Sequence, residues 1–201
     1  MTTAHPSAEH TAESSVFRAA LRREKLAARL ALDAARHSGL SAAIEGHLES
    51  LLDQHMPQTM AFCAPVQGEF DARPLVTRLI AYGWRAAMPV VETAAAPMAF
   101  RAWQADSPMT RDRHGIPIPA ERISASPDLI LLPLVAFDAR GYRLGYGGGY
   151  FDRTLAAMVL RPYTIGIGFE LARSESIRPE KHDIALDVIV TDAGVFYTPS
   201  G

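Results

Sequence analysis

Residues 128–137 read Asp128-Leu-Ile-Leu-Leu-Pro-Leu-Val-Ala-Phe137, and this run is apolar after its first residue. A continuous apolar run of this kind is typical of a strand that is covered on both faces. The chain goes on as Asp-Ala-Arg-Gly-Tyr-Arg-Leu-Gly-Tyr-Gly-Gly-Gly-Tyr-Phe-Asp-Arg153. The glycines predict a loop that leads into a helix over residues 150–160. A buried strand followed by a loop and a helix indicates an α/β fold.

Strand and helix patterns alternate on both sides of this segment. Further helices are expected at residues 14–36, after a cap at Ser14 or Ser15, from Ser41 to a point before Pro57, and at residues 71–82. Further strands are expected at residues 59–64, 84–91, 98–103, 163–169 and 186–190. Residues 105–127 contain four prolines and predict a long irregular connection. The alternation predicts a parallel or mixed sheet with helices on both sides.

The composition limits the classes of protein to consider. With 48% hydrophobic and 21% charged residues, the 201-residue chain fits a globular domain, and its net charge of −2 argues against a bulk nucleic-acid binder. The single cysteine, Cys63, excludes an internal disulfide or a multi-cysteine metal site. The sequence has neither a signal-peptide pattern nor a membrane-length apolar run. We expect a cytoplasmic monomer without nucleic-acid or membrane partners.

The chain shows no repeat and no linker that would divide it. Residues 14–201 are therefore expected to form one domain. Residues 1–13 carry small and polar side chains and are expected to form a disordered tail.

The first expected helix carries an excess of positive charge. Six basic residues stand against two acidic ones, Glu24 and Asp33, which leaves +4; the basic residues are Arg18, Arg22, Arg23, Lys25, Arg29 and Arg36. One interpretation is a solvated helix face, and the other is a face that binds an anion.

The glycine-rich segment has the chemistry of a phosphate site. A helix start presents free backbone N–H groups and a positive dipole end, and glycines let that backbone approach an anion closely. Arg143 adds a fork of donors for phosphate oxygens. Asp152 falls in the first turn of the helix, where its carboxylate could hold a cation that bridges phosphates. The segment therefore predicts a nucleotide–metal site.

Other interpretations of this segment stay open at this point. The glycines can serve only as turns, and Asp152 only as a partner of the helix dipole. The chain lacks the G-x-x-x-x-G-K-[ST] loop. It also lacks the third glycine of the dinucleotide fingerprint, because Tyr150 or Asp152 stands at that position. Glu170 could take the role of the ribose-binding acid, so an NAD(P)-dependent oxidoreductase is an alternative.

Residues 132–153 resemble the signature of the 5-formyltetrahydrofolate cyclo-ligases, also called methenyltetrahydrofolate synthetases, almost residue for residue. Weaker similarities occur at residues 18–22, 65–69, 114–119, 182–183 and 190–192. The resemblance implies a three-layer α/β/α sandwich around a mixed, mostly parallel, Rossmann-like sheet. It also implies the ATP-dependent closure of 5-formyltetrahydrofolate to 5,10-methenyltetrahydrofolate through a phosphorylated formyl (iminophosphate) intermediate, with ADP and phosphate released and Mg²⁺ as cofactor.

The resemblance also implies roles for individual residues. The residues implied to bind ATP are Arg18, where the family usually has Lys, Arg22, Arg143, Leu144, Gly145, Tyr146, Gly147, Gly148, Gly149, Tyr150 and Phe151. Those implied to bind the folate are Ala64, Glu69, Gly147, Gly148, Gly149 and Tyr150. Arg143 and Tyr150 are the implied catalytic residues. Asp152 and Asp183 are the implied Mg²⁺ residues.

Two positions depart from the family pattern. Ala172 stands where the family often has Gln, and Ile118 where it often has Glu or Gln. If both positions border the folate pocket, these changes would weaken pterin recognition. They motivate a second alternative, a folate- or nucleotide-binding protein without turnover. Without the resemblance, Asp183 is expected to pair with Lys181 on the surface, and Glu69 to cap the following helix.

Overall fold

A seven-stranded sheet forms the centre of the protein in the computed structural model, which describes the backbone of residues 8–199 and the side chains of residues 13–199. Its strand order is β11-β10-β9-β6-β1-β2-β3. The strands are β1 (Thr59–Ala61), β2 (Arg85–Val90), β3 (Ala99–Trp103), β6 (Leu129–Pro133), β9 (Tyr163–Ile167), β10 (Val188–Thr191) and β11 (Gly194–Tyr197). The five inner strands are mutually parallel, whereas the edge strands β3 and β11 are antiparallel to their neighbours.

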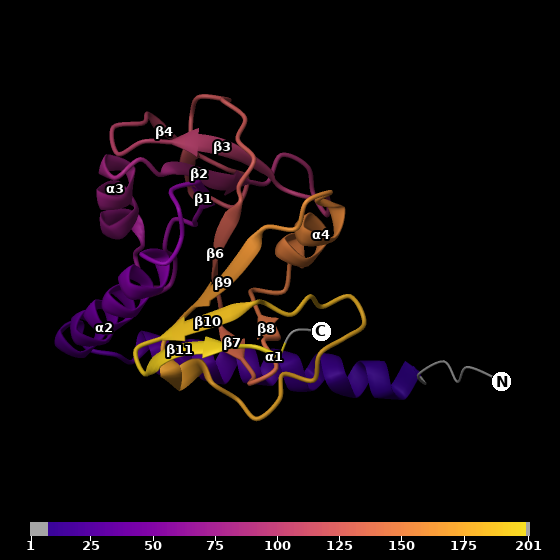
Figure 1. Ribbon diagram of the computed structural model, residues 1–201. Helices are drawn as coiled ribbons and strands as arrows, with labels where there is room; N and C mark the ends of the chain where they lie inside the picture. Colours follow the sequence, from indigo (N-terminus) through magenta and orange to yellow (C-terminus); the bar gives the residue numbers. More distant parts are fainter. Residues whose placement is uncertain (1–7, 200–201) are drawn as a thin grey trace.

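Helices cover both faces of this sheet. They are α1 (Ala8–Leu30), α2 (Ala34–Leu52), α3 (Arg73–Ala81) and α4 (Tyr150–Ala157), with a short 3-10 turn at Glu170–Ala172. Along β1, Met60 packs with buried residues of α2 and α3, while the next residue, Ala61, packs with Leu155 of α4. Successive strand residues point to opposite faces, so the two clusters lie on opposite sides of the sheet. Figure 1 shows α2 and α3 on one side and α4 on the other, which confirms the predicted three-layer, mostly parallel α/β fold.

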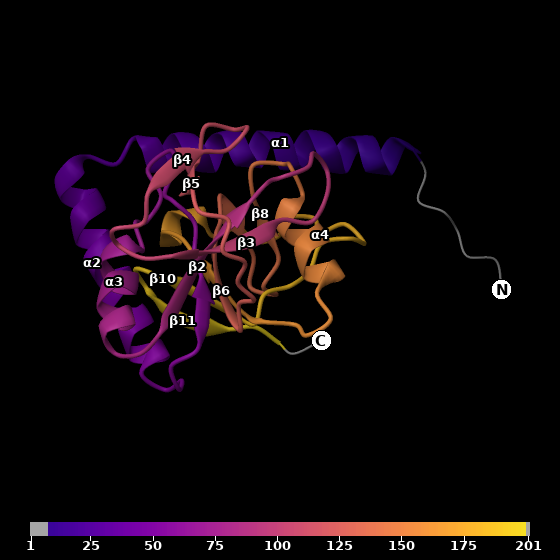
Figure 2. The same ribbon diagram turned by 90° about the horizontal axis from the view of Figure 1, so that it is seen from above.

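Helix α1 crosses the edge at which the parallel strands end. Arg29 near its end donates to the Leu134 carbonyl just after β6 and to the Gln67 carbonyl in the segment after β1. Leu21 packs in a small cluster with Ala136 and Leu144, which belong to the two-stranded pair of β7 (Ala136–Phe137) and β8 (Arg143–Leu144). The first turns of α1 extend beyond the body of the molecule in both ribbon views (Figures 1 and 2). Within the described residues, no helix is long and apolar enough to cross a membrane.

The proline-rich segment is more ordered than predicted. Within residues 105–127, β4 (Met109–Arg111) and β5 (Pro117–Pro119) form an antiparallel hairpin. Arg101 of β3 donates to the Pro119 carbonyl and anchors the hairpin to the main sheet. The prolines are compatible with this hairpin because they lie on a two-stranded edge, where not every N–H has to be paired.

The N-terminal helix prediction was wrong at both ends. Helix α1 already begins at Ala8, so only residues 1–7 of the expected tail lie outside the described part of the chain. Residues 8–13 are rich in Ala and Glu, which favour helix over coil. The helix ends at Leu30, and Asp33 then caps α2 by accepting from the Arg36 N–H. Ser41 lies inside α2 rather than at its start, because the Asp33 cap comes earlier in the chain.

Strand boundaries also differ from the predictions. The apolar run of residues 128–137 forms two strands, because the chain leaves the sheet after Pro133 and pairs with β8 instead. The last strand of the parallel set, β10, is followed by an antiparallel strand, β11, that the sequence analysis missed. A tight turn at Asp192–Ala193 reverses the chain between them. The other predicted strands and helices are present with shorter bounds.

Candidate active site

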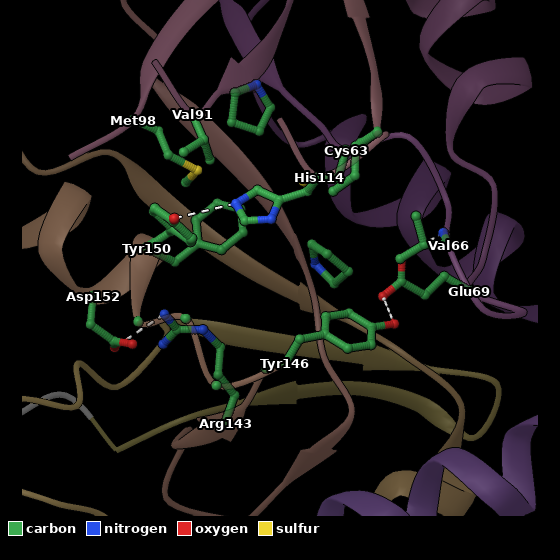
Figure 3. A pocket seen from close by; sticks show the side chains of 18 of the residues that line it. Cys63, Val66, Glu69, Val91, Met98, His114, Arg143, Tyr146, Tyr150 and Asp152 are labelled. Carbon is green, nitrogen blue, oxygen red and sulfur yellow. Dashed lines mark hydrogen bonds and ion pairs between the residues drawn. The ribbon is translucent and has the colours of Figure 1, made fainter. Parts of the chain in front are cut away.

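One cavity of about 470 Å³ lies at the carboxyl ends of the parallel strands. Such an edge is where open α/β sheets bind their ligands. Its walls come from α1, the segments after β1, β2 and β6, the β4–β5 turn, the glycine loop with the start of α4, and residues 180–183. Figure 3 shows that Arg143 and Asp152 lie at one end of the cavity, and Glu69 and Tyr146 at the other.

Two arginine–aspartate pairs form the charged end. Arg18 of α1 donates to both carboxylate oxygens of Asp183, at 2.5 and 3.1 Å. Arg143 of β8 donates to Asp152 Oδ1 at 3.1 Å and to the Ile184 carbonyl at 2.8 Å. Asp152 Oδ1 also accepts from the Ile184 N–H, which ties α4 to the 180–184 segment. Two arginines and two carboxylates therefore converge from α1, the 143–152 stretch and residue 183, three parts of the chain that are distant in sequence.

The two arginine–aspartate pairs influence the pKa values at the charged end of the cavity. Burial opposes the charged form of Asp183, but the Arg18 guanidinium and the Glu180 N–H outweigh it and keep the Asp183 pKa below its ordinary value. Burial likewise opposes the charge on Arg18, and its bonds to Asp183 outweigh this and raise its pKa. Burial lowers the pKa of Arg143, with Asp152 opposing the change. Both arginines start far above neutral pH, so both stay protonated and can donate to an anion.

The glycine loop lies between these arginines and the start of α4. Arg22 Nε donates to the Gly145 carbonyl at 2.8 Å and fixes the loop against α1. Gly147 and Gly149 have φ of 95° and 62°, in the left-handed region that favours glycine, and Gly149 is the residue that precedes α4. A Cβ at Gly148 would lie only 2.8 Å from the Tyr150 ring. The loop therefore needs glycine at three successive positions, and it leaves the N–H groups at the start of α4 open to a ligand.

The opposite end of the cavity centres on a buried carboxylate. The Tyr146 hydroxyl donates to Glu69 Oε1 at 2.7 Å, and the Val66 N–H donates to Oε2 at 3.0 Å. Arg29 lies 3.9 Å from Glu69 Oε1 and donates to the Tyr146 hydroxyl at 2.6 Å. Burial raises the pKa of Glu69, and these three partners oppose the rise. Apolar side chains also line the cavity, among them Val66, Met88, Val91, Met98 and Ile116.

A profile of the 5-formyltetrahydrofolate cyclo-ligase family matches residues 14–192. The chain belongs to this family. It is 31% identical to the 5-formyltetrahydrofolate cyclo-ligase of Escherichia coli (strain K12) over 148 residues, which cover 70% of this chain and 81% of that protein. The corresponding protein of Mycolicibacterium smegmatis is 29% identical over 180 residues, covering 85% of this chain and 91% of its own.

Solved structures of cyclo-ligases share the fold. The structure of Aquifex aeolicus 5,10-methenyltetrahydrofolate synthetase aligns with a TM-score of 0.78 and 28% identity, over 92% of this chain and 94% of that one. The synthetase of Mycoplasma pneumoniae aligns with a TM-score of 0.68 and 26% identity, over 87% of this chain and 98% of that one.

Membership in the cyclo-ligase family decides against the alternative of an NAD(P)-dependent oxidoreductase. In agreement, Glu170 binds Arg173 and Thr191 and does not line the cavity.

The cavity of this cyclo-ligase brings together most of the residues singled out from the sequence. Those that line it are Arg18, Arg22, Ala64, Glu69, Arg143, Gly145, Tyr146, Gly147, Gly148, Gly149, Tyr150, Phe151, Asp152 and Asp183. Leu144 does not, because strand alternation turns it into the cluster with Leu21. The Tyr146 side chain reaches the Glu69 end, far from the charged end (Figure 3).

Two alternative interpretations of single residues were wrong. Asp183 pairs with the buried Arg18 rather than with Lys181. Glu69 does not cap α3; Asp71 accepts from the Arg73 N–H there instead.

Neither departure from the family pattern is a lining residue of the cavity, although Pro117, next to Ile118, lines it. Ile118 and Ala172 are buried, and neither is part of the lining. Ala172 packs with Leu134, Phe137 and Ile189 in a small apolar cluster. The reason given for a protein without turnover is therefore removed.

His114 is a lining residue that the sequence analysis did not assign. It lies in the β4–β5 turn, and its Nε2 is 3.3 Å from the Tyr150 hydroxyl, with the two rings packed edge to face (Figure 3). Its only sequence signal was the short family-like stretch at residues 114–119.

Among the carboxylates that line the cavity, Asp152 and Asp183 are the implied Mg²⁺ residues, and by themselves they form no complete protein cage. Among the residues that the structure describes, no group of three or more potential metal ligands occurs. Asp152 Oδ2 receives no hydrogen bond from the described residues, whereas both oxygens of Asp183 are engaged by Arg18. Mg²⁺ is often held by only one or two carboxylates together with substrate phosphates, and these two carboxylates fit that mode of coordination.

Proposed function

We propose that this cavity closes 5-formyltetrahydrofolate to 5,10-methenyltetrahydrofolate with the consumption of ATP. The observation that carries the proposal is the division of one cavity into two ends. A glycine loop between three arginines suits a triphosphate, and a buried carboxylate surrounded by apolar walls suits a pterin.

The triphosphate would lie against the glycine loop. The N–H groups from Gly145 to Phe151 would donate to its oxygens, as at other helix starts. Arg18, Arg22 and Arg143 would supply the opposing charge; Arg18 and Arg143 are held by Asp183 and Asp152, and Arg22 by the Gly145 carbonyl. Because Arg143 is only 7% exposed, its charge would act with little screening by water.

Asp152 and Asp183 would hold Mg²⁺ together with phosphate oxygens. Such an ion supplies neutralising charge between phosphates. Asp152 has a carboxylate oxygen available for this, while Asp183 would first have to release Arg18. Asp183 would then exchange Arg18 for Mg²⁺, and Arg18 would exchange Asp183 for a phosphate oxygen. Each charged group would therefore keep a partner of opposite charge.

The folate would lie along the apolar wall with its pterin at Glu69. A carboxylate accepts from the amino and ring N–H donors of a pterin. Tyr150, Phe151, Ala64 and Gly148 also line the cavity, and they would keep the formyl group near the γ-phosphate.

The residues account for the two chemical steps. The formyl oxygen takes the γ-phosphoryl group and gives an iminophosphate, and Arg143 offsets the charge that builds up on that group. The N10 amine then attacks the formyl carbon, and phosphate leaves as the ring closes. The Tyr150 ring lies against Gly148 of the loop, and its hydroxyl, which His114 contacts, would lie near the phosphorylated oxygen.

A direct assay tests the proposal. Purified protein is mixed with ATP, Mg²⁺ and 5-formyltetrahydrofolate, and the near-UV absorbance of the methenyl product is followed together with ADP release. Equimolar formation of both products is expected. Binding of nucleotide and folate without product would refute the proposed turnover.

A further inference from the structure

We propose that Arg29 is a positioning residue that holds Tyr146 and Glu69 in place for the pterin, although it does not line the cavity itself. The inference deepens the proposed function and rests on it. Arg29 lies on α1 behind the wall formed by Tyr146 and Glu69, and only 5% of it is exposed. No part of the family signature that led to the other site residues includes it.

The guanidinium of Arg29 joins three separate segments. Nε donates to the Gln67 carbonyl at 2.9 Å, Nη1 to the Leu134 carbonyl at 3.1 Å, and Nη2 to the Tyr146 hydroxyl at 2.6 Å. These acceptors belong to the segment after β1, the segment after β6 and the glycine loop. A planar fork with donors in fixed directions can do this, and the point charge of a lysine cannot.

The bond to Tyr146 decides where the tyrosine proton points. Because Arg29 occupies an acceptor site of the hydroxyl oxygen, that hydroxyl donates onward to Glu69 Oε1. The Val66 N–H occupies one site of Oε2. A carboxylate has about four acceptor sites, so roughly one remains on each oxygen. Those two sites are available side by side for two neighbouring N–H donors of a pterin.

Arg29 also supplies the nearest positive charge to a carboxylate that is 7% exposed. The other titratable groups near Glu69 are the Tyr146 hydroxyl and the partly buried Cys63 thiol, both of which have raised pKa values and remain neutral. Without Arg29, burial would drive Glu69 toward its protonated form, which offers fewer acceptor sites. Loss of Arg29 should therefore weaken folate binding, and more so at low pH.

The position of Arg29 on α1 connects the Glu69 end of the cavity to the charged end. Arg18, Arg22 and Arg29 fall at i, i+4 and i+11, which places them on one side of the helix, over about 16 Å of its axis. Arg18 and Arg22 serve the charged end, and Arg29 serves the Glu69 end. One helix face therefore supports both ends of the cavity, and a variant at Arg29 should affect only one of them.

The test compares Arg29→Gln and Arg29→Lys with Arg23→Gln, an exposed arginine of the same helix. Calorimetry measures the binding of 5-formyltetrahydrofolate and of Mg-ATP separately, and steady-state assays give KM for each. Arg29→Gln is expected to weaken folate binding roughly 10- to 100-fold, the range for a buried hydrogen bond to a charged group. ATP binding should change less than about threefold, since an interaction confined to the other end has little coupling to it. Arg29→Lys should recover only part of the loss, and Arg23→Gln should match the wild type.

The pH profile gives a second readout. In the wild type, folate KM should rise as the pH falls through the pKa of Glu69, and Arg29→Gln should move that rise to higher pH. Equal weakening of ATP and folate binding, or an unmoved profile, would mean a merely structural role and would overturn the proposal. If Arg29→Gln does not fold, Tyr146→Phe removes the hydroxyl between Arg29 and Glu69 and keeps the ring; unchanged folate binding in that variant would overturn it as well.

Failure of the proposed function can be told apart from failure of this inference. A wild-type protein that binds folate without turnover would refute the function, while the binding data on the variants would still decide the role of Arg29. A wild-type protein that does not bind 5-formyltetrahydrofolate would overturn both.

Discussion

Arg18 and Asp183, which are 165 positions apart, form a two-bonded ion pair at the charged end of the cavity. The Asp183 side chain is only 4% exposed, and that of Arg18 only 9%. Because breaking a buried pair from one side leaves an uncompensated charge, this contact both positions Arg18 and joins α1 to the 180–183 segment.

The Arg18–Asp183 pair should make the stability of the protein depend on pH in the acid range. The Asp183 pKa is lowered in the folded state, so its contribution is present above its unfolded pKa of about 4 and is lost as the pH falls through the lower folded value. Urea unfolding between pH 7 and pH 2.5 should show a shallower acid loss in Asp183→Asn than in the wild type. Superimposable slopes would exclude this contribution. Asp71 also has a lowered pKa, so some acid loss remains in the variant.

Gly145 allows a test of phosphate approach that does not disturb the loop. A Cβ there meets nothing within 4 Å, and its φ is not left-handed. Gly145→Ala should therefore keep a thermal midpoint within about 2 °C of wild type and weaken ATP binding about tenfold or more, because the methyl group stands where a phosphate would approach the backbone. The matched control is Gly39→Ala in α2, where a Cβ also meets nothing. Full ATP affinity in Gly145→Ala would place the phosphates elsewhere.

Arg143 should act mainly on the rate of the chemical step. Arg143→Ala is expected to lower kcat about 10²- to 10³-fold, as removal of one charge-stabilising group does. Because Asp152 would lose its partner, circular dichroism must confirm that the variant is folded. Arg143→Lys keeps the positive charge but lacks the forked donors of arginine, and its kcat should lie between those of the wild type and Arg143→Ala. A kcat near that of the wild type in a folded Arg143→Ala protein would remove Arg143 from the reaction.

Asp152 should set the response to magnesium. Asp152→Asn keeps the oxygen that accepts from Arg143 and the Ile184 N–H, and removes the negative charge. The Mg²⁺ concentration for half-maximal activity should rise at least about tenfold, since Mg²⁺ prefers a charged oxygen ligand. The exposed Asp106→Asn is the control. An unchanged magnesium titration would argue that Asp152 only orients Arg143.

Several parts of the fold could be predicted because they depend on local patterns. The apolar run before the glycine loop and the helix after it form β6 and α4. The break between α1 and α2 was predicted after residue 36 but lies at residues 31–33, since its position depends on the competition between Asp33 and Ser41 as helix caps. The ten-residue apolar run was predicted as one strand, because nothing in its pattern shows that β7 pairs with β8 rather than with β9.

The sequence by itself determined the family, the α/β architecture, and the loop and charged residues of the candidate site. Those features depend on residues that are close together in the sequence, so their order and the glycine spacing are enough to predict them. Only the tertiary structure decided that Asp183 meets Arg18, that Arg29 supports Tyr146 and Glu69, that His114 reaches Tyr150, and that Ile118 and Ala172 stay outside the cavity. These relationships join segments that are far apart in the chain, so no local sequence pattern predicts them. The contacts of Arg18 and Arg29 follow from the crossing of α1 over the strand ends.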